Sequence, residues 1–193
     1  MASMRNAFLI ALPLMTTMAC GGPGPEPAAS HEATSGAETS KAEDGIGLEN
    51  ERQPREGLIT SGAPTEQQLV RAEERGIDRV ISLQTRSEPG AAEERAIVER
   101  LGMKFVRIPV DGPEGVTKEA AEELHTALSN AEDQDVILHC ASGNRSGALL
   151  ALRAFHHEDK SVQEALELGR AAGMTSLEPI VRDQLTAAER DGE

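Results

Sequence analysis

The sequence predicts an α/β domain with a mainly parallel central sheet and helices on both of its faces. Short runs of β-branched and other apolar residues alternate with longer segments that have the 3.6-residue periodicity of amphipathic helices. This alternation is typical of βα units, whose strands pair in parallel and are buried on both faces. The domain is expected to span residues 56–193, which is a single-domain length.

The order of the elements follows from the apolar runs and the helix-end signals. Strands are predicted at 58–59, 80–83, 105–110 and 136–138. Helices are predicted at 65–76, 91–101, 117–130, 148–152, 161–173 and 177–190. Thr65 with Gln68, and Ser161 with Glu164, have the spacing of capping boxes, in which two side chains satisfy amides at a helix start. Pro179 falls in a first helical turn, where a missing N–H is tolerated.

The N-terminal segment 1–20 has the pattern of a bacterial export signal. Arg5 precedes an apolar run from Ala7 to Met15, which is too short to span a bilayer as a helix. Thr17-Met18-Ala19-Cys20 resembles a lipoprotein processing site, in which Cys20 becomes the lipidated first residue. Ordinary secretory cleavage nearby is the alternative. An exported protein, lipid-anchored in the bacterial cell envelope or secreted, is therefore expected.

Residues 21–55 are rich in Pro, Gly, Ala, Ser, Thr and Glu, and only Ile46 and Leu48 interrupt this composition near its end. Such a segment has too little apolar surface to form a core, so we expect a disordered tether. The whole chain carries 33 Asp and Glu against 19 Lys and Arg, a net charge of -14. This charge argues against nucleic acid as a partner and against membrane contact other than through the lipid.

The candidate catalytic segment lies between the strand at 136–138 and the following helix. It runs from His139 and Cys140 through Ala141, Ser142, Gly143 and Asn144 to Arg145 and Ser146. The backbone amides of such a loop and the start of the next helix face one point, which suits an oxyanion. Arg145 adds a planar guanidinium that can contact two oxygens, and the same field would hold Cys140 as the thiolate.

Each of these residues has an ordinary structural role when it is considered alone. A single cysteine at a strand end is commonly an inert apolar side chain. The combination of Cys140, Gly143 and Arg145 at this spacing is more specific. If Cys20 carries lipid, Cys140 has no disulfide partner within the chain, which also favours a catalytic thiol.

The segment resembles the active-site signature of the cysteine-dependent phosphatases, in which His-Cys precedes a loop closed by Arg-Ser or Arg-Thr. Only Ala141, Ser142, Gly143 and Asn144 stand between Cys140 and Arg145, one residue fewer than in the common dual-specificity form. The shorter loop resembles the "beta-lactamase hydrolase-like protein, phosphatase-like domain" family, also called DSP-PTPase-like. The run from Ile59 to Thr65 resembles that family's opening motif. The short loop also resembles the active loop of the sulfur-transferring rhodaneses.

The resemblance implies roles for further residues. Asp111, on an acidic loop that we expect to be flexible, corresponds to the general acid of the dual-specificity phosphatases, with Glu114 as the alternative. Ser146 would donate a hydrogen bond to the thiolate, or would instead be the N-cap of the helix. The amides of Ala141, Ser142, Gly143 and Asn144 would bind substrate. His139 would orient the loop and tune the thiolate.

Three functions are compatible with these residues. The first is a phosphatase acting through a phosphocysteine on a phosphorylated small molecule or phosphoprotein, and the second is a rhodanese-like sulfurtransferase. The third is a module that binds an oxyanion without catalysis. No cofactor is expected. No metal is expected either, because His156 and His157 are adjacent on a helix and point about 100° apart; cations at a helix end are the simpler explanation. Arg86, after the strand at 80–83, could rim the pocket.

Overall fold

A five-stranded sheet in the order β1-β2-β5-β3-β4 organises the folded part of the chain. The computed structural model describes residues 45–191 of the 193 in the sequence. The strands are β1 (Arg52–Arg55), β2 (Leu58–Ser61), β3 (Arg79–Ser82), β4 (Lys104–Arg107) and β5 (Val136–His139). Neighbouring strands from β2 to β4 pair in parallel, and only β1 runs antiparallel at the edge.

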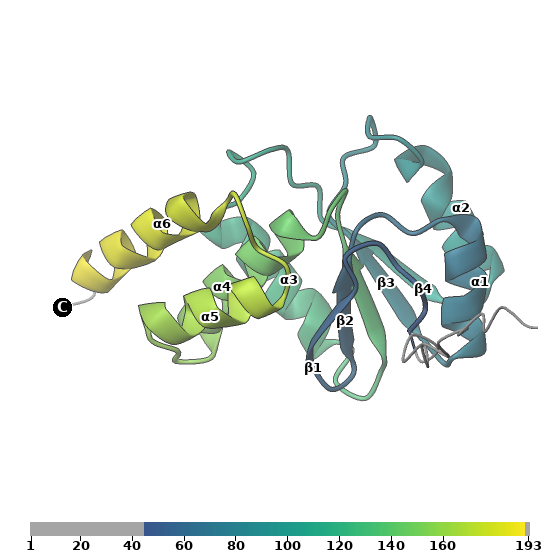
Figure 1. Cartoon of the computed structure of the whole chain (residues 1–193), viewed down its shortest axis with the longest axis horizontal. Coiled ribbons are helices and arrows are strands. Elements are labelled where there is room, and N and C mark those ends of the chain that lie inside the picture. Colours follow the sequence, from purple (N-terminus) through teal and green to yellow (C-terminus); the bar gives the residue numbers. More distant parts are fainter. Residues whose placement is uncertain (1–44, 192–193) are drawn as a thin grey trace, which may run out of the picture. The chain divides into compact units, whose positions relative to one another are not determined.

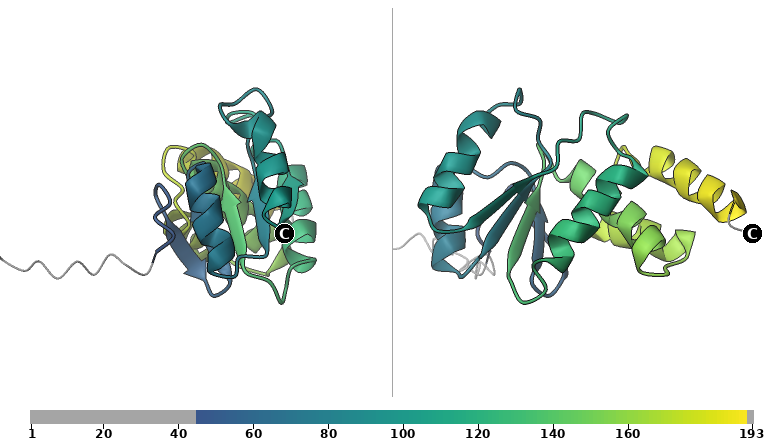
Figure 2. Two further views of the ribbon diagram at one scale, coloured as in Figure 1. Left: turned by 90° about the vertical axis from the view of Figure 1, so that its right-hand side faces the viewer. Right: turned by 180° about the vertical axis from the view of Figure 1, so that it is seen from behind.

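Six helices lie on the two sides of this sheet, and the last of them packs against other helices, as Figure 1 shows. They are α1 (Glu66–Glu74), α2 (Ala91–Arg100), α3 (Lys118–Ser129), α4 (Asn144–His157), α5 (Val162–Ala171) and α6 (Glu178–Asp191). Helices α1 and α2 lie on one face and α3 to α6 on the other, and the view from behind in Figure 2 shows the same division. The predicted α/β class is therefore confirmed. Among the helices between residues 45 and 191, none has the length and apolar content that a membrane crossing requires.

The core has one cluster on each face of the sheet. On the side of α3 to α6, Leu138 and Cys140 of the central region pack with Leu124 of α3 and Leu149 of α4. On the side of α1 and α2, Ile137 packs with residues of those helices and of β4. Successive residues of β5 thus point to opposite faces, as the pleat of a buried strand requires.

The local helix signals are confirmed where the structure describes them. Thr65 and Ser161 are the N-caps of α1 and α5, and both make the reciprocal side-chain and backbone bonds of a capping box. The apolar face predicted for the helix at 117–130 is buried in α3: Ala121, Leu124, Ala127 and Leu128. These features depend on residues within two helical turns of one another, so the sequence alone is sufficient to predict them.

The expected tether is too long at its C-terminal end. Residues 52–55 form β1, and the two apolar residues of the preceding segment, Ile46 and Leu48, are only 3% and 6% exposed. They pack with Leu69 of α1 and Val80 of β3. Two isolated apolar residues are therefore enough to fix this segment on the domain, because a neighbouring helix and strand supply the rest of the core. The expected signal segment and residues 21–44 of the tether lie outside the described residues.

Several strand and helix boundaries also differ from the prediction by a few residues, and two of these differences lie next to the candidate site. Strand β4 ends at Arg107, although the Ile108 and Val110 N–H groups still donate to Ser82 O and Leu83 O at the end of the neighbouring strand. Helix α4 begins at Asn144 instead of Ala148. Arg145 and Ser146 consequently lie in the first turn of the helix and not in a loop before it.

Candidate active site

Cys140 directly follows β5, at the carboxyl end of the central strand. It is a free cysteine with 1% of its surface exposed. Its backbone N–H donates to Ser61 O of the adjacent strand at 3.3 Å. The Gly143 N–H donates to Cys140 Sγ at 3.1 Å. The chain therefore turns back over the sulfur immediately after the strand.

The turn depends on Gly143, the N-cap of α4, whose φ of 90° lies in the left-handed region that glycine adopts at little cost. The next N–H groups, those of Asn144, Arg145 and Ser146, belong to the first turn of α4 and have no carbonyl partner within the helix. Gly147 N–H is the first to bond inside it, to Gly143 O at 3.1 Å. The start of α4 thus presents free amide donors beside Cys140, where the helix dipole also favours an anion.

Arg145 is held by Glu88, which lies in the loop between β3 and α2. Glu88 Oε1 accepts from Arg145 Nη1 at 2.8 Å, and Oε2 accepts from Nη2 at 2.5 Å. Arg145 Nη1 also donates to Val110 O at 2.6 Å. These bonds occupy the end of the guanidinium. Within residues 45–191, the remaining edge, formed by Nε–H and the second Nη2–H of Arg145, donates to no oxygen atom. The Cys140 side chain also interacts with this guanidinium and raises the pKa of Arg145.

The pair is electrostatically strong. The hydrogen bond from Arg145 lowers the pKa of Glu88 from 4.5 to about 2, against the opposing effect of its partial burial. The same bond raises the pKa of Arg145. Both side chains are mostly shielded from solvent, at 13% and 22% exposed for Arg145 and Glu88. Both groups are therefore charged across the physiological pH range, and Arg145 is in place before any ligand arrives.

A cavity of about 450 Å³ opens over this loop. Among the residues that line it are Ala141, Ser142, Asn144 and Arg145 from the Cys140 segment, and Asp111 from the loop after β4. Glu114, the alternative acid, lines a different cavity with residues of α3 and α6. Of the two predicted acids, only Asp111 therefore lies at the same cavity as the candidate nucleophile's loop.

The loop that carries Asp111 is a closed turn. Gly115 N–H donates to Asp111 O at 3.1 Å, and a Cβ on Gly115 would lie 2.4 Å from the Asp111 nitrogen. Only glycine at position 115 allows the backbone to close so tightly. The flexibility expected of this loop stays a prediction. The Asp111 side chain is exposed at the mouth of the cavity.

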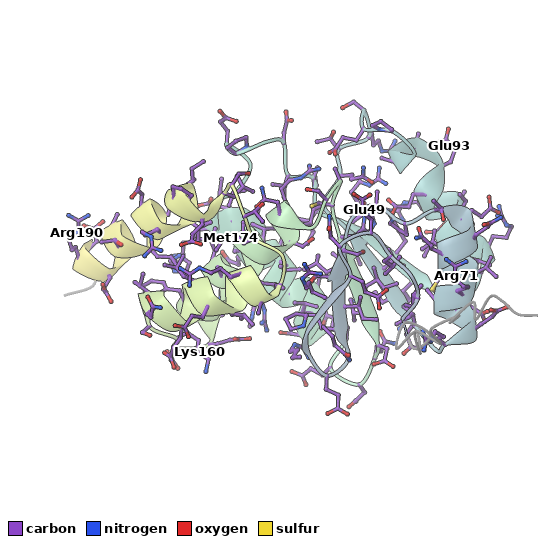
Figure 3. The ribbon with its side chains drawn as sticks, in the orientation of Figure 1. Glu49, Arg71, Glu93, Lys160, Met174 and Arg190 are labelled. Atoms are coloured by element: carbon purple, nitrogen blue, oxygen red, sulfur yellow. The ribbon has the colours of Figure 1, made fainter. Side chains whose placement is uncertain are left out.

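Two segments far away in the sequence hold the Cys140 loop from either side. Asn50 Nδ2 donates to Ser142 O at 3.2 Å. On the other side, the Asn144 side chain accepts from Thr175 N–H and donates to Ser176 Oγ, both at 2.8 Å. Figure 3 labels Glu49 and Met174, which neighbour these contacts in the sequence. The Asn144 side chain thus anchors the loop, while its backbone N–H is one of the free donors at the start of α4.

Ser146 does not have the N-cap role, because Gly143 is the N-cap of α4. Its hydroxyl is fully buried and donates to Leu138 O at 3.4 Å. The hydrogen bond predicted from Ser146 to the thiolate stays a prediction.

His139 points to the face of the sheet opposite Cys140 and is fully buried. Its Nε2 lies 2.5 Å from Glu94 Oε1 of α2, and Glu94 Oε2 accepts from Arg107 Nη2 at 3.0 Å. Burial raises the pKa of Glu94, but the hydrogen bond with His139 and the charge of Arg107 outweigh this effect and leave the pKa below its usual value. Any influence of His139 on Cys140 therefore acts through the backbone and through the field, and not by direct contact.

Other predicted residues lie elsewhere. Cys20 is outside the described residues. Arg86 does not line the cavity above the Cys140 loop but a separate one. His157 of α4 stacks on His125 of α3, with ring centroids 4.2 Å apart, and burial lowers the pKa of His157 and of His156. This shift disfavours the cationic forms that we expected at this helix end. Residues 45–191 contain no group of three side chains arranged to hold a metal ion.

Sequence reasoning missed Glu88, Glu94 and Asn50. Glu88 follows a predicted strand by a few residues, and that strand is the neighbour of β5. Its position in a loop at the carboxyl end of a strand could have indicated that Glu88 lies at the site. Glu94 and Asn50 had no such signal, because one lies within a helix and the other within the presumed tether.

Comparisons with known proteins place the fold. No family model matches the sequence, and no curated protein matches it. Solved structures do match. A "Putative phosphatase (DUF442)" from Shewanella putrefaciens CN-32 is 25% identical with a TM-score of 0.60, over 74% of this chain and 92% of that chain. A "putative phosphatase" from Neisseria meningitidis z2491 is 26% identical with a TM-score of 0.59, over 71% and 96%.

A third structure is kinase associated phosphatase with its catalytic-site cysteine replaced by serine. It is 21% identical with a TM-score of 0.51, over 67% of this chain and 88% of that chain, and it supports the fold alone. The predicted resemblance to phosphatases is thus confirmed by the structural neighbours, and the fold is like that of the cysteine-dependent phosphatases. The narrower beta-lactamase hydrolase-like name has no support among them.

Proposed function

We propose that this protein is a cysteine-dependent phosphatase that hydrolyses a phosphomonoester through a phosphocysteine at Cys140. One arrangement carries the proposal. The Cys140 sulfur, the free amides at the start of α4 and Arg145 lie together at the end of β5, beneath a cavity that Arg145 and Asp111 line. Nucleophile, oxyanion donors and a candidate acid are the parts that phosphoryl transfer needs. The likeness to structures named as phosphatases supports it.

In the first step the Cys140 thiolate attacks phosphorus and forms a P–S bond while the P–O bond to the leaving group breaks. The Asp111 carboxylic acid gives its proton to the departing oxygen. The phosphoryl oxygens are bound by the first-turn amides of α4 and by the Nε and Nη2 edge of Arg145, which remains available because Glu88 occupies the other end of the guanidinium.

In the second step the Asp111 carboxylate takes a proton from water, and the water oxygen attacks phosphorus. The P–S bond breaks, inorganic phosphate is released and the Cys140 thiolate is restored. The oxyanion donors serve both steps, because both transition states place negative charge on the same equatorial oxygens. The substrate is a phosphorylated small molecule or a phosphoprotein.

The interval of four residues between Cys140 and Arg145 favours a second function, sulfur transfer. The Cys140 thiolate would attack the outer sulfur of thiosulfate, break the S–S bond, release sulfite and become a persulfide. Cyanide would then remove that sulfur as thiocyanate and restore the thiolate. This chemistry needs no general acid, so Asp111 at the cavity favours the phosphatase.

The two activities are separated by assaying the purified full chain with an aryl phosphate and, in parallel, with thiosulfate plus cyanide. We expect release of phosphate, with loss of activity in Cys140→Ser and unchanged activity in Cys20→Ser, the matched variant at the other cysteine. Thiocyanate formation without phosphate release would identify a sulfurtransferase. Phosphate binding without either reaction would identify an oxyanion-binding module.

We also propose that the protein is exported and anchored to the bacterial cell envelope through a lipid on Cys20. The support is the sequence alone: a charged start, a short apolar run and Thr17-Met18-Ala19-Cys20. Metabolic labelling with a radioactive fatty acid in a bacterial host should mark the protein. Labelling that persists in Cys20→Ser would refute the lipid anchor, while Cys140→Ser should leave labelling intact.

A further inference from the structure

A second cavity, of about 370 Å³, lies beside α2 and is lined by three arginines. Arg86 comes from the loop after β3, Arg95 from α2 and Arg107 from β4, and Ala92 and Pro109 complete the lining. No acidic side chain lines it. In a chain with a net charge of -14, three guanidinium groups around one hollow are a local exception.

Arg107 is fixed in position without any ligand. Its Nη2 donates to Ala91 O at 2.6 Å and to Glu94 Oε2 at 3.0 Å, and its side chain is 12% exposed. The guanidinium also lies 5.2 Å from the centroid of the Phe105 ring. Within residues 45–191 its Nη1 donates no hydrogen bond. A held guanidinium loses little conformational entropy when it binds an anion.

The other two guanidinium groups are less engaged. Arg95 also lies over the Phe105 ring, at 4.9 Å, and has only an exposed ion pair with Glu99, a type of pair that contributes little. Arg86 is exposed and makes no hydrogen bond or ion pair with any described residue. Their hydrogen-bonding capacity is thus largely open to a ligand from solution.

This cavity lies next to the candidate active site. Thr85, Ser87 and Glu88 line the cavity above the Cys140 loop, whereas Arg86, within the same loop, lines the arginine cavity. Along the other shared segment, Asp111 faces the first cavity and Pro109 the second. The two cavities therefore share the loops after β3 and β4 as a common wall.

We propose that the cavity formed by Arg86, Arg95 and Arg107 binds a second phosphate-type oxyanion, separate from the one held by Arg145. Guanidinium groups from three different elements can each contact a different oxygen of a tetrahedral anion. A planar carboxylate has only two oxygens and cannot contact all three groups in this way. The anion is either a second phosphate of the substrate, in which case the proposal rests on the proposed phosphatase function, or a free phosphate ion.

The site can be tested without any catalytic assay. In a titration of the full chain with inorganic phosphate, followed by ¹H–¹⁵N NMR, we expect two sets of shifted signals. One comes from the Ala141–Arg145 amides, and the other from Ala92 and the arginine Nε–H groups of the second cavity. The double variant Arg86→Gln, Arg95→Gln loses two charge-assisted contacts. The phosphate affinity derived from the second set of shifts should therefore fall at least about tenfold, while the affinity derived from the first set should not change.

A matched control removes the same charge elsewhere. Arg100→Gln with Arg182→Gln replaces two exposed arginines that pair with Glu66 and Glu178, and it should leave both sets of shifts unchanged. If phosphate shifts no signal at the second cavity, or if both double variants weaken binding there equally, the proposed site does not exist. This experiment measures phosphate binding and not catalysis. A negative result would therefore not contradict the proposed phosphatase function, and an absence of phosphatase activity would not contradict the second phosphate site.

A kinetic comparison identifies the source of the anion. The substrates compared are a benzene bisphosphate and phenyl phosphate. If the second cavity binds a phosphate of the substrate, the double variant Arg86→Gln, Arg95→Gln should raise the KM for the bisphosphate about tenfold and leave the KM for phenyl phosphate unchanged. Unchanged KM values, together with loss of the second set of NMR shifts, assign the cavity to free phosphate. Either result is possible only if the second cavity binds phosphate.

Discussion

Glu88 holds Arg145 end-on, with each carboxylate oxygen accepting from a different terminal nitrogen, at 2.8 and 2.5 Å. The two residues are 57 positions apart in the sequence, and the contact exists because β3 and β5 are neighbours in the sheet. Glu88 therefore decides which edge of the guanidinium is left for an oxyanion.

Replacing Glu88 should impair substrate binding and turnover although Glu88 is not proposed to touch the reacting atoms. In Glu88→Gln the Arg145 fork is held less rigidly, and we expect kcat/KM for an aryl phosphate to fall roughly tenfold or more. The exposed neighbour Glu93 offers a control, since Glu93→Gln should leave kcat/KM unchanged. Equal activity in the two variants would mean that Arg145 is oriented without Glu88.

The same pair predicts a pH dependence of stability. The pKa of Glu88 is 4.5 in the reference state and about 2 in the folded protein, so the folded state favours the carboxylate. The stabilisation is complete above about pH 5 and is lost as the pH falls toward 2. We expect the difference in unfolding free energy between wild type and Glu88→Gln, on the order of 1–3 kcal/mol at pH 7, to shrink across this window. Urea denaturation at several pH values measures it, and a constant difference down to pH 3 would contradict the assignment.

Asp111 is expected to act as the general acid. Asp111→Asn should lower the turnover of substrates with poor leaving groups by roughly 10²–10⁴-fold, because their departing oxygen needs a proton. Activated aryl phosphates should lose less. Glu114→Gln is the matched control, since Glu114 lies at another cavity and its variant should be active on both substrates. An equal loss on both substrates in Asp111→Asn would indicate a structural role in the turn closed by Gly115.

Glu94 lies between His139 and Arg107 in a buried polar cluster. Removing its carboxylate leaves Arg107 partly unpaired in the interior, so Glu94→Ala should reduce the unfolding free energy by about 3 kcal/mol. Because the folded state lowers the pKa of Glu94, this stabilisation is present above its ordinary pKa and is lost at more acidic pH. Glu93→Ala, on the exposed side of α2, should change the unfolding free energy by less than about 0.5 kcal/mol.

Gly147 allows α4 to approach α5 and the segment that follows it. A Cβ at this position would lie 2.3 Å from Met174 N and 2.4 Å from Gly169 O, which are backbone atoms and cannot turn aside. Gly147→Ala should therefore destabilise the fold by at least about 1–3 kcal/mol in a urea titration. Gly169→Ala should cost less, because the nearest atom is the movable end of the Met174 side chain, at 2.7 Å. A larger loss for Gly169→Ala than for Gly147→Ala would show that the backbone there can shift.

The sequence by itself determined the features that depend on neighbours along the chain. The capping boxes at Thr65 and Ser161, the apolar face of α3 and the strand, turn and helix around Cys140 need only a few consecutive residues. For the same reason the α/β class and the central position of Cys140 and Arg145 in the candidate site were predictable.

Only the tertiary structure decided the contacts between distant segments. The pairing of Glu88 with Arg145, the burial of Glu94 against His139, and the meeting of Arg86, Arg95 and Arg107 depend on the strand order β1-β2-β5-β3-β4. The burial of Ile46 and Leu48 depends equally on α1 and β3 being beside them. No local pattern encodes that order, because each strand pairing is selected by the total burial and hydrogen bonding of the assembled sheet and not by the residues of one strand.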